Sequence, residues 1–261
     1  MRSLLFVTII FSSIYGYAFD HSHKAFTEIL SKHVSYSGIG GAESKVNYKA
    51  LLKDRGPLNA YIKTIEAVKK SDFDAFSPKQ QLAFLINTYN AHTIKLILDN
   101  YPTKSILKVT FLSPFWKKFI NLFGDEVSLE YVEHTLIRKV FFEKHYVEPM
   151  IHFAVNCAAI GCPRLRNEAF VADKLEVQFE EQAKLFLRDT TRIGLDNEKK
   201  ELSVSLIFTK FAEDWDKSKF KGLQPYLAVY MTDDPAIQAS LKKKEFKIVE
   251  RDYNWDLNEK K

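Results

Sequence analysis

The longest apolar stretch of the chain lies between residues 82 and 98, where hydrophobic side chains occupy nearly every face of a helix. Ser77 and Pro78 precede it and Pro102 follows it, and these residues are typical of a helix N-cap, a first helical turn and a helix stop. We therefore predict one helix over 77–100. Because such a helix is apolar on all sides, it is expected to be buried.

Weaker patterns predict the other elements. Apolar residues at spacings of three and four predict helices over 23–33, 58–69, 128–140, 173–188, 206–215, 223–231 and 235–244. Residues 117–127 resemble a hairpin, and 151–156, 201–205 and 246–250 resemble strands. The predicted fold class is α+β: a helix-rich single domain with a small, mainly antiparallel sheet.

The N-terminus has the pattern of a secretory signal peptide. Arg2 precedes an apolar run over 4–14, and small residues at 16 and 18 offer a cleavage site. An apolar run of about a dozen residues is shorter than the ~20 needed to span a bilayer, which favours cleavage over a retained anchor. We therefore expect an exported protein, periplasmic or extracellular, with no stable membrane span after cleavage.

Composition narrows the classes of function. The chain is 46% hydrophobic and 14% aromatic, which excludes a disordered protein. Its formal charge of +5 is spread among acidic residues, apart from a run at 242–244 and the last two lysines, so no nucleic-acid partner is expected. We divide the chain into a signal peptide (1–18), an N-terminal helical extension (19–41), a main domain (42–258) and a basic tail (259–261).

The only two cysteines, Cys157 and Cys162, directly follow the predicted strand over 151–156. In an exported protein they are expected to form a short-loop disulfide or a redox pair. The alternative is that Cys157 is a reactive thiol, held at the end of the strand beside Asn156. Neither arrangement is excluded by the sequence.

Four motifs give the chain a family resemblance. They occupy 85–91, 129–138, 151–165 and 253–258, and together with the intervening helices they cover roughly 58–258. In their order and spacing they are similar to the domain-of-unknown-function family 547, here as an exported bacterial member. The resemblance implies that Glu133, His134 and Arg138 act as a unit. It also implies that Cys157 matters more than Cys162, since eukaryotic relatives keep the first cysteine and replace the second with serine.

A thiol nucleophile needs a base and a group that orients the base. We predict that His134 lies beside Cys157 as the base and that Glu133 orients it. His152 is five residues from Cys157, an odd separation that would direct it to the opposite face of a regular strand. It is therefore expected to be a buried, hydrogen-bonded residue rather than the base.

Two amides, Asn87 and Asn90, lie three residues apart on the apolar helix. Buried amides without partners would cost about 1–3 kcal/mol each, so they must bond to something specific. We predict that at least one of them bonds to backbone near 156–163. Both would then support the site.

Three functions fit these patterns. The first is a cysteine-dependent hydrolase or acyl transferase acting on an amide or thioester, and the second is a thiol-redox or low-molecular-weight-thiol-binding module, suggested by the glutaredoxin-like neighbours that the family resemblance implies. The third is a non-catalytic envelope binding domain with a Cys157–Cys162 disulfide. A small-molecule or peptide ligand is expected in each case. No cofactor and no metal ion are expected, because the spacing of cysteines and histidines matches no metal motif.

Overall fold

The structure is a computed structural model, and it describes residues 19–111, 113–141 and 149–260. The predicted signal peptide and the last residue of the basic tail lie outside the described residues. The α-helices are α1 (Lys24–His33), α2 (Tyr48–Lys53), α3 (Gly56–Glu66), α4 (Lys70–Ala75), α5 (Pro78–Asp99), α7 (Leu175–Leu187), α8 (Leu206–Lys210), α9 (Ala212–Lys217), α10 (Leu223–Tyr230) and α11 (Pro235–Lys242). Shorter 3₁₀ helices are η1 (Ile39–Gly41), η2 (Ile106–Lys108), η4 (Pro149–Phe153) and η5 (Ala172–Lys174), and η3 (Tyr131–Phe141) is a π-helix.

The strands form three small sheets. β1 (Val34–Ser37) pairs antiparallel with β2 (Glu43–Val46), and β3 (Lys118–Leu122) pairs antiparallel with β4 (Asp125–Ser128). β6 (Glu201–Ser205) lies between β5 (Gly194–Asp196), to which it is antiparallel, and β7 (Lys247–Arg251), to which it is parallel. Helices outnumber these short strands, so the predicted α+β class is confirmed.

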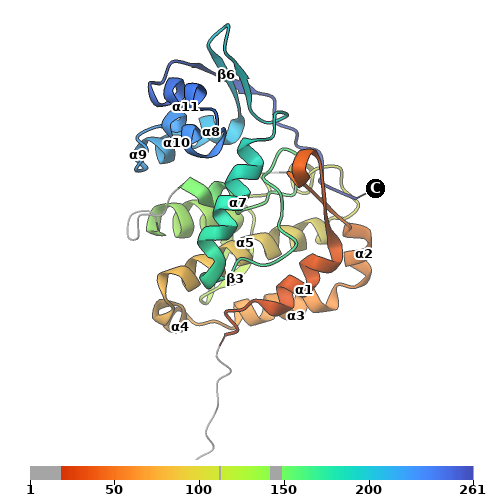
Figure 1. The fold of residues 1–261 in the computed structure, drawn as a ribbon. Helices are drawn as coiled ribbons and strands as arrows, with labels where there is room; N and C mark the ends of the chain where they lie inside the picture. The colour runs from red at the N-terminus through yellow and green to blue at the C-terminus, as the bar shows by residue number, and fades with distance from the viewer. Residues whose placement is uncertain (1–18, 112, 142–148, 261) are drawn as a thin grey trace, which may run out of the picture.

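Helix α5 is the central element of the fold (Figure 1). Ser77 accepts a hydrogen bond from the Gln80 backbone, and the Gln80 side chain accepts one from the Ser77 backbone, so a capping box starts the helix as the sequence indicates. Nearly every residue from Leu82 to Leu98 is buried. The prediction of a helix covered on all sides is confirmed.

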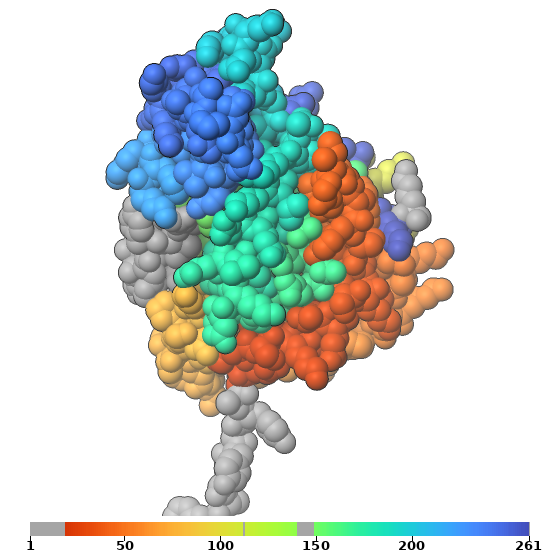
Figure 2. Space-filling model, in the orientation of Figure 1, coloured from red at the N-terminus to blue at the C-terminus, as the bar shows by residue number. Residues whose placement is uncertain are grey.

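The C-terminal helices pack on α7 and η4 through aromatic side chains. Figure 2 shows α8–α11 as a blue lobe at the upper left of the molecule, above the red part. Trp215 is fully buried, with ring centroids 5.1 Å from Phe208, 5.0 Å from Tyr226 and 6.1 Å from Phe153. Phe153 ends η4, so this aromatic cluster joins the C-terminal lobe to the segment that leads into the cysteines.

The predicted helix over 128–140 is confirmed in position but is a π-helix. Ser128 Oγ accepts a hydrogen bond from the Tyr131 backbone N–H at 3.1 Å, as a cap does. Val132 and Ile137, five residues apart, are both fully buried. That spacing suits the i to i+5 bonding of a π-helix, a form found often at functional sites.

The predicted strand over 151–156 is wrong. The segment is η4 followed by irregular chain. No strand within 19–111, 113–141 or 149–260 pairs with it, and side chains from helices satisfy its backbone instead: Gln182 Nε2 donates to Phe153 O at 3.0 Å, and Asn90 Nδ2 donates to Ala154 O at 2.9 Å. The expectation that His152 and Cys157 point to opposite faces assumed a regular strand, so it no longer holds.

Two smaller expectations also change. The helix expected to start with an Asp173 capping box starts instead at Leu175, with no side-chain cap. The helix over 206–215 is two helices that meet at Phe211. The predicted domain boundary between 41 and 42 stays a prediction; it lies in the β1–β2 connection, where Gly38 and Gly40 have positive φ angles and turn the chain.

Two buried histidines predict how stability depends on pH. Burial lowers the pKa of His23 and of His92 from the usual 6.5 to about 4. Both rings are neutral in folded and unfolded protein above pH 6.5, whereas between 6.5 and 4 the unfolded chain binds protons that the folded protein excludes. We expect the free energy of unfolding to fall through this window, by about 3 kcal/mol for each ring.

Guanidinium unfolding at about pH 7 and about pH 4.5 would measure this loss. His92→Phe keeps the ring volume and removes one titrating group, so its stability should decrease less with acidification than that of the unmodified protein. An equal loss of unfolding free energy between the two pH values in both proteins would contradict the assignment of this pH dependence to His92.

Candidate functional site at the disulfide

The two cysteines form a disulfide with a Cα–Cα distance of 6.1 Å. Cys157 is half-buried, whereas Cys162 is only 4% exposed. The backbone N–H of Cys157 donates to Cys162 Sγ at 2.9 Å. Ala158, inside the loop, has a φ of 59°, which is strained for a residue with a Cβ and is typical of functional sites.

Side chains hold the disulfide loop from inside the protein. Asn90 Oδ1 accepts the Asn156 backbone N–H at 2.9 Å, and Asn156 Nδ2 donates to Pro163 O at 2.8 Å, which closes the base of the loop. Arg192 donates to the carbonyl oxygens of Gly161 and Cys162, both at 2.7 Å. Asp189 accepts from Arg192 Nε at 2.9 Å and so fixes the guanidinium.

The C-terminal motif runs antiparallel along the same loop. Gly161 N–H donates to Asn254 O at 2.8 Å, and Ala159 forms a bridge with Leu257. A Cβ at position 161 would lie 3.0 Å from Asn254 O and from the Tyr253 ring, so a larger residue would have to push these neighbours back by a few tenths of an ångström. Asn254 contributes its backbone carbonyl to this pairing, and its side chain accepts the Asp256 backbone N–H at 2.9 Å.

Tyr253 places its hydroxyl against both sulfur atoms, 3.3 Å from Cys157 Sγ and 3.2 Å from Cys162 Sγ. A disulfide carries no proton, so the hydroxyl is the donor. Burial raises the pKa of Tyr253 above its usual value, Arg192 opposes that effect, and Glu133 adds to it. The phenol therefore stays protonated and remains a donor across the physiological pH range.

The disulfide opens to a cavity of about 300 Å³. Both sulfur-bearing residues line it, as do Glu133, His134 and His152. Its walls are largely aromatic, made by Tyr89, Phe115, Trp116, Phe211, Tyr253 and Trp255. A cavity of this size suits a small molecule or a few residues of a peptide.

His152 belongs to a buried ion-pair network. Its Nε2 donates to Asp214 Oδ2 at 2.8 Å, and Arg138 donates to both oxygens of Asp214, at 2.7 and 2.9 Å. The His152 ring also stacks on Phe211 with a centroid distance of 4.3 Å. Burial acts to raise the pKa of Asp214, but the hydrogen bonds from His152 and Arg138, together with the Arg138 charge, outweigh it and hold that pKa well below its usual value.

His134 is paired with Arg138 rather than with Glu133. Arg138 Nη1 lies 2.8 Å from His134 Nδ1, and because a guanidinium can only donate, Nδ1 is the acceptor. Burial lowers the pKa of His134, and Arg138 lowers it further, while Glu133 opposes both. Adjacent residues on a helix point apart, so Glu133 reaches Tyr89 instead.

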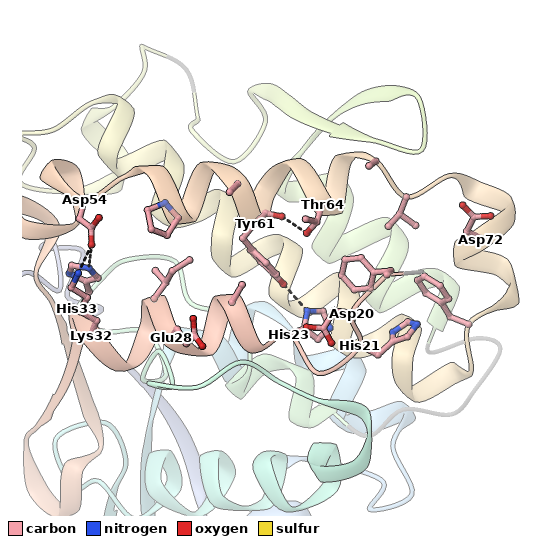
Figure 3. A pocket seen from close by; sticks show the side chains of 18 of the residues that line it. Asp20, His21, His23, Glu28, Lys32, His33, Asp54, Tyr61, Thr64 and Asp72 are labelled. Carbon is pink, nitrogen blue, oxygen red and sulfur yellow. Dashed lines mark hydrogen bonds and ion pairs between the residues drawn. The ribbon is translucent and has the colours of Figure 1, made fainter. Parts of the chain in front are cut away.

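A second cavity, of about 1100 Å³, lies between α1 and α3 (Figure 3). It is larger than the disulfide cavity, but the two share no residue. At one end Lys32 pairs with Asp54, and at the other His23 contacts the Tyr61 hydroxyl at 2.7 Å. No thiol reaches it, so we place the candidate chemistry at the smaller cavity. In the described part of the chain, no three His, Cys, Asp or Glu side chains gather as metal ligands.

Part of this site matches a known family. Residues 73–187 match the family described as "Protein of unknown function, DUF547". Residues 73–187 form a DUF547 family domain. They run from α4 to the end of α7 and include Cys157, His134, His152 and both α5 amides. Comparisons with curated proteins and with solved structures found no match.

The structure brings most of the expected site residues together. Asn90 bonds to Asn156 next to the cysteines, as predicted, whereas Asn87 clamps the backbone of Phe170 away from them. Both His134 and His152 reach the cavity. Three residues of the site were not predicted from the sequence: Tyr253 as a hydrogen-bond donor to the sulfur atoms, Arg192 and Asp214. Of these, only Tyr253 had a signal in the sequence, because it lies in one of the family motifs.

The two amides of α5 allow a matched comparison. Asn87→Leu and Asn90→Leu each leave one buried N–H and one buried C=O without a partner, so each is expected to destabilise the protein by about 2–6 kcal/mol. Only Asn90→Leu frees the base of the disulfide loop. We expect it alone to speed reduction of the disulfide by dithiothreitol, measured under conditions where both variants are folded. Equal reduction rates in the two variants would show that Asn90 does not support the site.

Proposed function

We propose that the domain performs thiol–disulfide exchange at the Cys157–Cys162 bond with a low-molecular-weight thiol or a cysteine-containing peptide. The observation that carries the proposal is the contact of one tyrosine hydroxyl with both sulfur atoms at the wall of a cavity. We further propose that the protein is exported, since an oxidising compartment would keep the bond formed in the resting state.

The chemistry follows from the unequal burial of the two cysteines. An external thiolate attacks Sγ of Cys157, the more exposed residue, and forms a mixed disulfide while the bond to Cys162 breaks. The electron pair leaves on Cys162 as a thiolate, which the Cys157 N–H and the Tyr253 hydroxyl stabilise by hydrogen bonds. A second external thiolate then attacks the mixed disulfide. It releases Cys157 as a thiolate and the external partner as its own disulfide, and water protonates the two cysteines.

Trapping the mixed disulfide tests the proposal. Cys162→Ser should accumulate a glutathione adduct on Cys157 that is visible by mass spectrometry, whereas Cys157→Ser should form little adduct on the buried Cys162. Tyr253→Phe should slow reduction by glutathione about tenfold or more, because the leaving thiolate loses a charge-assisted hydrogen bond. Tyr36→Phe is the control, since its hydroxyl bonds to Asn167 and not to sulfur.

A disulfide that resists glutathione in the folded protein would contradict exchange. If both serine variants also lost equal stability, the bond would be a structural staple and the cavity a non-catalytic binding site.

A second candidate function is favoured by the pairing of His152 with Asp214. In the reduced protein, Cys157 would attack the carbonyl carbon of an amide or thioester, and water would later release the acyl group. A base needs a nitrogen lone pair that is free to accept a proton, and on this ground we assign the role to His152 instead of His134. The Nε2–H of His152 donates to Asp214, so in the neutral ring Nδ1 carries a free lone pair. The Nδ1 lone pair of His134 is already used to accept from Arg138, and its proton lies on Nε2.

Iodoacetamide labelling of the reduced protein across pH would test this function. We expect the Cys157 thiol to titrate below the usual value of about 8.5, with His152→Gln raising its pKa by about one unit or more and His134→Gln having a smaller effect. A Cys157 titration at the usual value, unchanged by His152→Gln, would contradict the role of Cys157 as a nucleophile toward amides or thioesters. It would not bear on the proposal of thiol–disulfide exchange.

A further inference from the structure

The described residues 104–111 and 113–118, here called the docking segment, expose large apolar side chains to water. Phe111 is fully exposed, Trp116 is 67% exposed and Leu107 is 43% exposed. Burying such a side chain is worth about 1.5–3 kcal/mol, so three in one segment indicate a surface that is covered when the protein works. Yellow-green atoms of this part of the chain lie at the right-hand edge of Figure 2.

The docking segment is also basic. Residues 101–124 contain four lysines and no acidic residue. Lys104, Lys108, Lys117 and Lys118 are all exposed, and none of the ion pairs among the described residues involves them. Their charge is therefore available to an anionic partner.

The ends of the docking segment are held firmly. Ser105 Oγ donates to Trp255 O at 2.7 Å, and Leu257 N–H donates to Lys104 O at 2.8 Å. At the other end, Phe115 O accepts the Glu130 backbone N–H at 2.9 Å. Ile106 is fully buried and anchors the first turn. Leu107, Phe111 and Trp116 are thus exposed on a stretch of chain whose two ends are fixed.

We propose that the docking segment binds the surface of an anionic lipid bilayer. Phe111, Trp116 and Leu107 enter the interfacial layer, where aromatic rings are favoured, and the lysines contact lipid phosphates. Each lysine near such a surface contributes about 1 kcal/mol, which adds to the apolar term. None of the described helices is long and apolar enough to cross a bilayer, so this contact is peripheral. The proposal does not depend on the cysteine chemistry.

Vesicle flotation tests the proposal. The oxidised protein is used without residues 1–18, because that apolar stretch would itself bind lipid. Vesicles of phosphatidylcholine mixed with phosphatidylglycerol should carry the protein up the gradient. Vesicles of phosphatidylcholine alone should carry much less, and salt should release the protein because it screens the lysines.

Variants locate the contact. Leu107→Ser/Phe111→Ser and Lys117→Glu/Lys118→Glu should each weaken binding about tenfold or more. The matched controls are Val177→Ser, at a site 61% exposed on α7, and Lys242→Glu/Lys243→Glu, which makes the same charge change at the last residue and the C-cap of α11. Both controls should bind like the unmodified protein, and thermal melts would verify that every variant is folded.

Two results would overturn the proposal. One is no flotation of the unmodified protein with anionic vesicles. The other is an equal loss of binding in the control and docking-segment variants, which would indicate a general effect of charge or hydrophobicity.

Discussion

The disulfide site depends on the two hydrogen bonds that Asn90 makes to irregular backbone. Its amide donates to Ala154 O and accepts from the Asn156 N–H, both at 2.9 Å, from the middle of a helix that is otherwise apolar and buried. Without them, each of these buried backbone groups would cost about 1–3 kcal/mol. The chain can therefore leave regular secondary structure just before Cys157, because the most rigid element of the fold supplies the missing partners.

The rest of the loop is completed by residues far away in the sequence. Arg192 donates hydrogen bonds to the carbonyl oxygens at the end of the loop, and the chain around Tyr253 pairs with one edge of the loop. Tyr253 thereby reaches both sulfur atoms across a separation of 96 residues from Cys157. The family match ends at residue 187, so both of these residues lie beyond it. The site consequently needs the chain after the matched region, although that region contains both cysteines.

The sequence predicted the elements whose signals are local. Helix α5 could be predicted because its signals, Ser77, Pro78 and a continuous apolar run, are visible in the sequence without any knowledge of tertiary contacts. The hydrogen bond of Asn90 could be predicted because a buried amide needs a partner. The segment over 151–156 was misread because apolar residues alone do not distinguish a strand from buried irregular chain. Asp214 could not be assigned to His152 from the sequence, because only tertiary packing brings α9 beside η4.

Arg138 determines where the protons lie in the cavity. It donates to His134 Nδ1 and to Asp214, and Asp214 in turn accepts from His152 Nε2. Because a guanidinium only donates, the proton of neutral His134 lies on Nε2; because the Asp214 carboxylate accepts from Nε2 of His152, the lone pair of neutral His152 lies on Nδ1. Arg138 and the carboxylate that it binds thus make one ring a donor and the other an acceptor toward the same cavity. Neighbouring histidines without such a partner would exchange tautomers freely, so the resemblance that grouped Arg138 with His134 has a physical basis in this pairing.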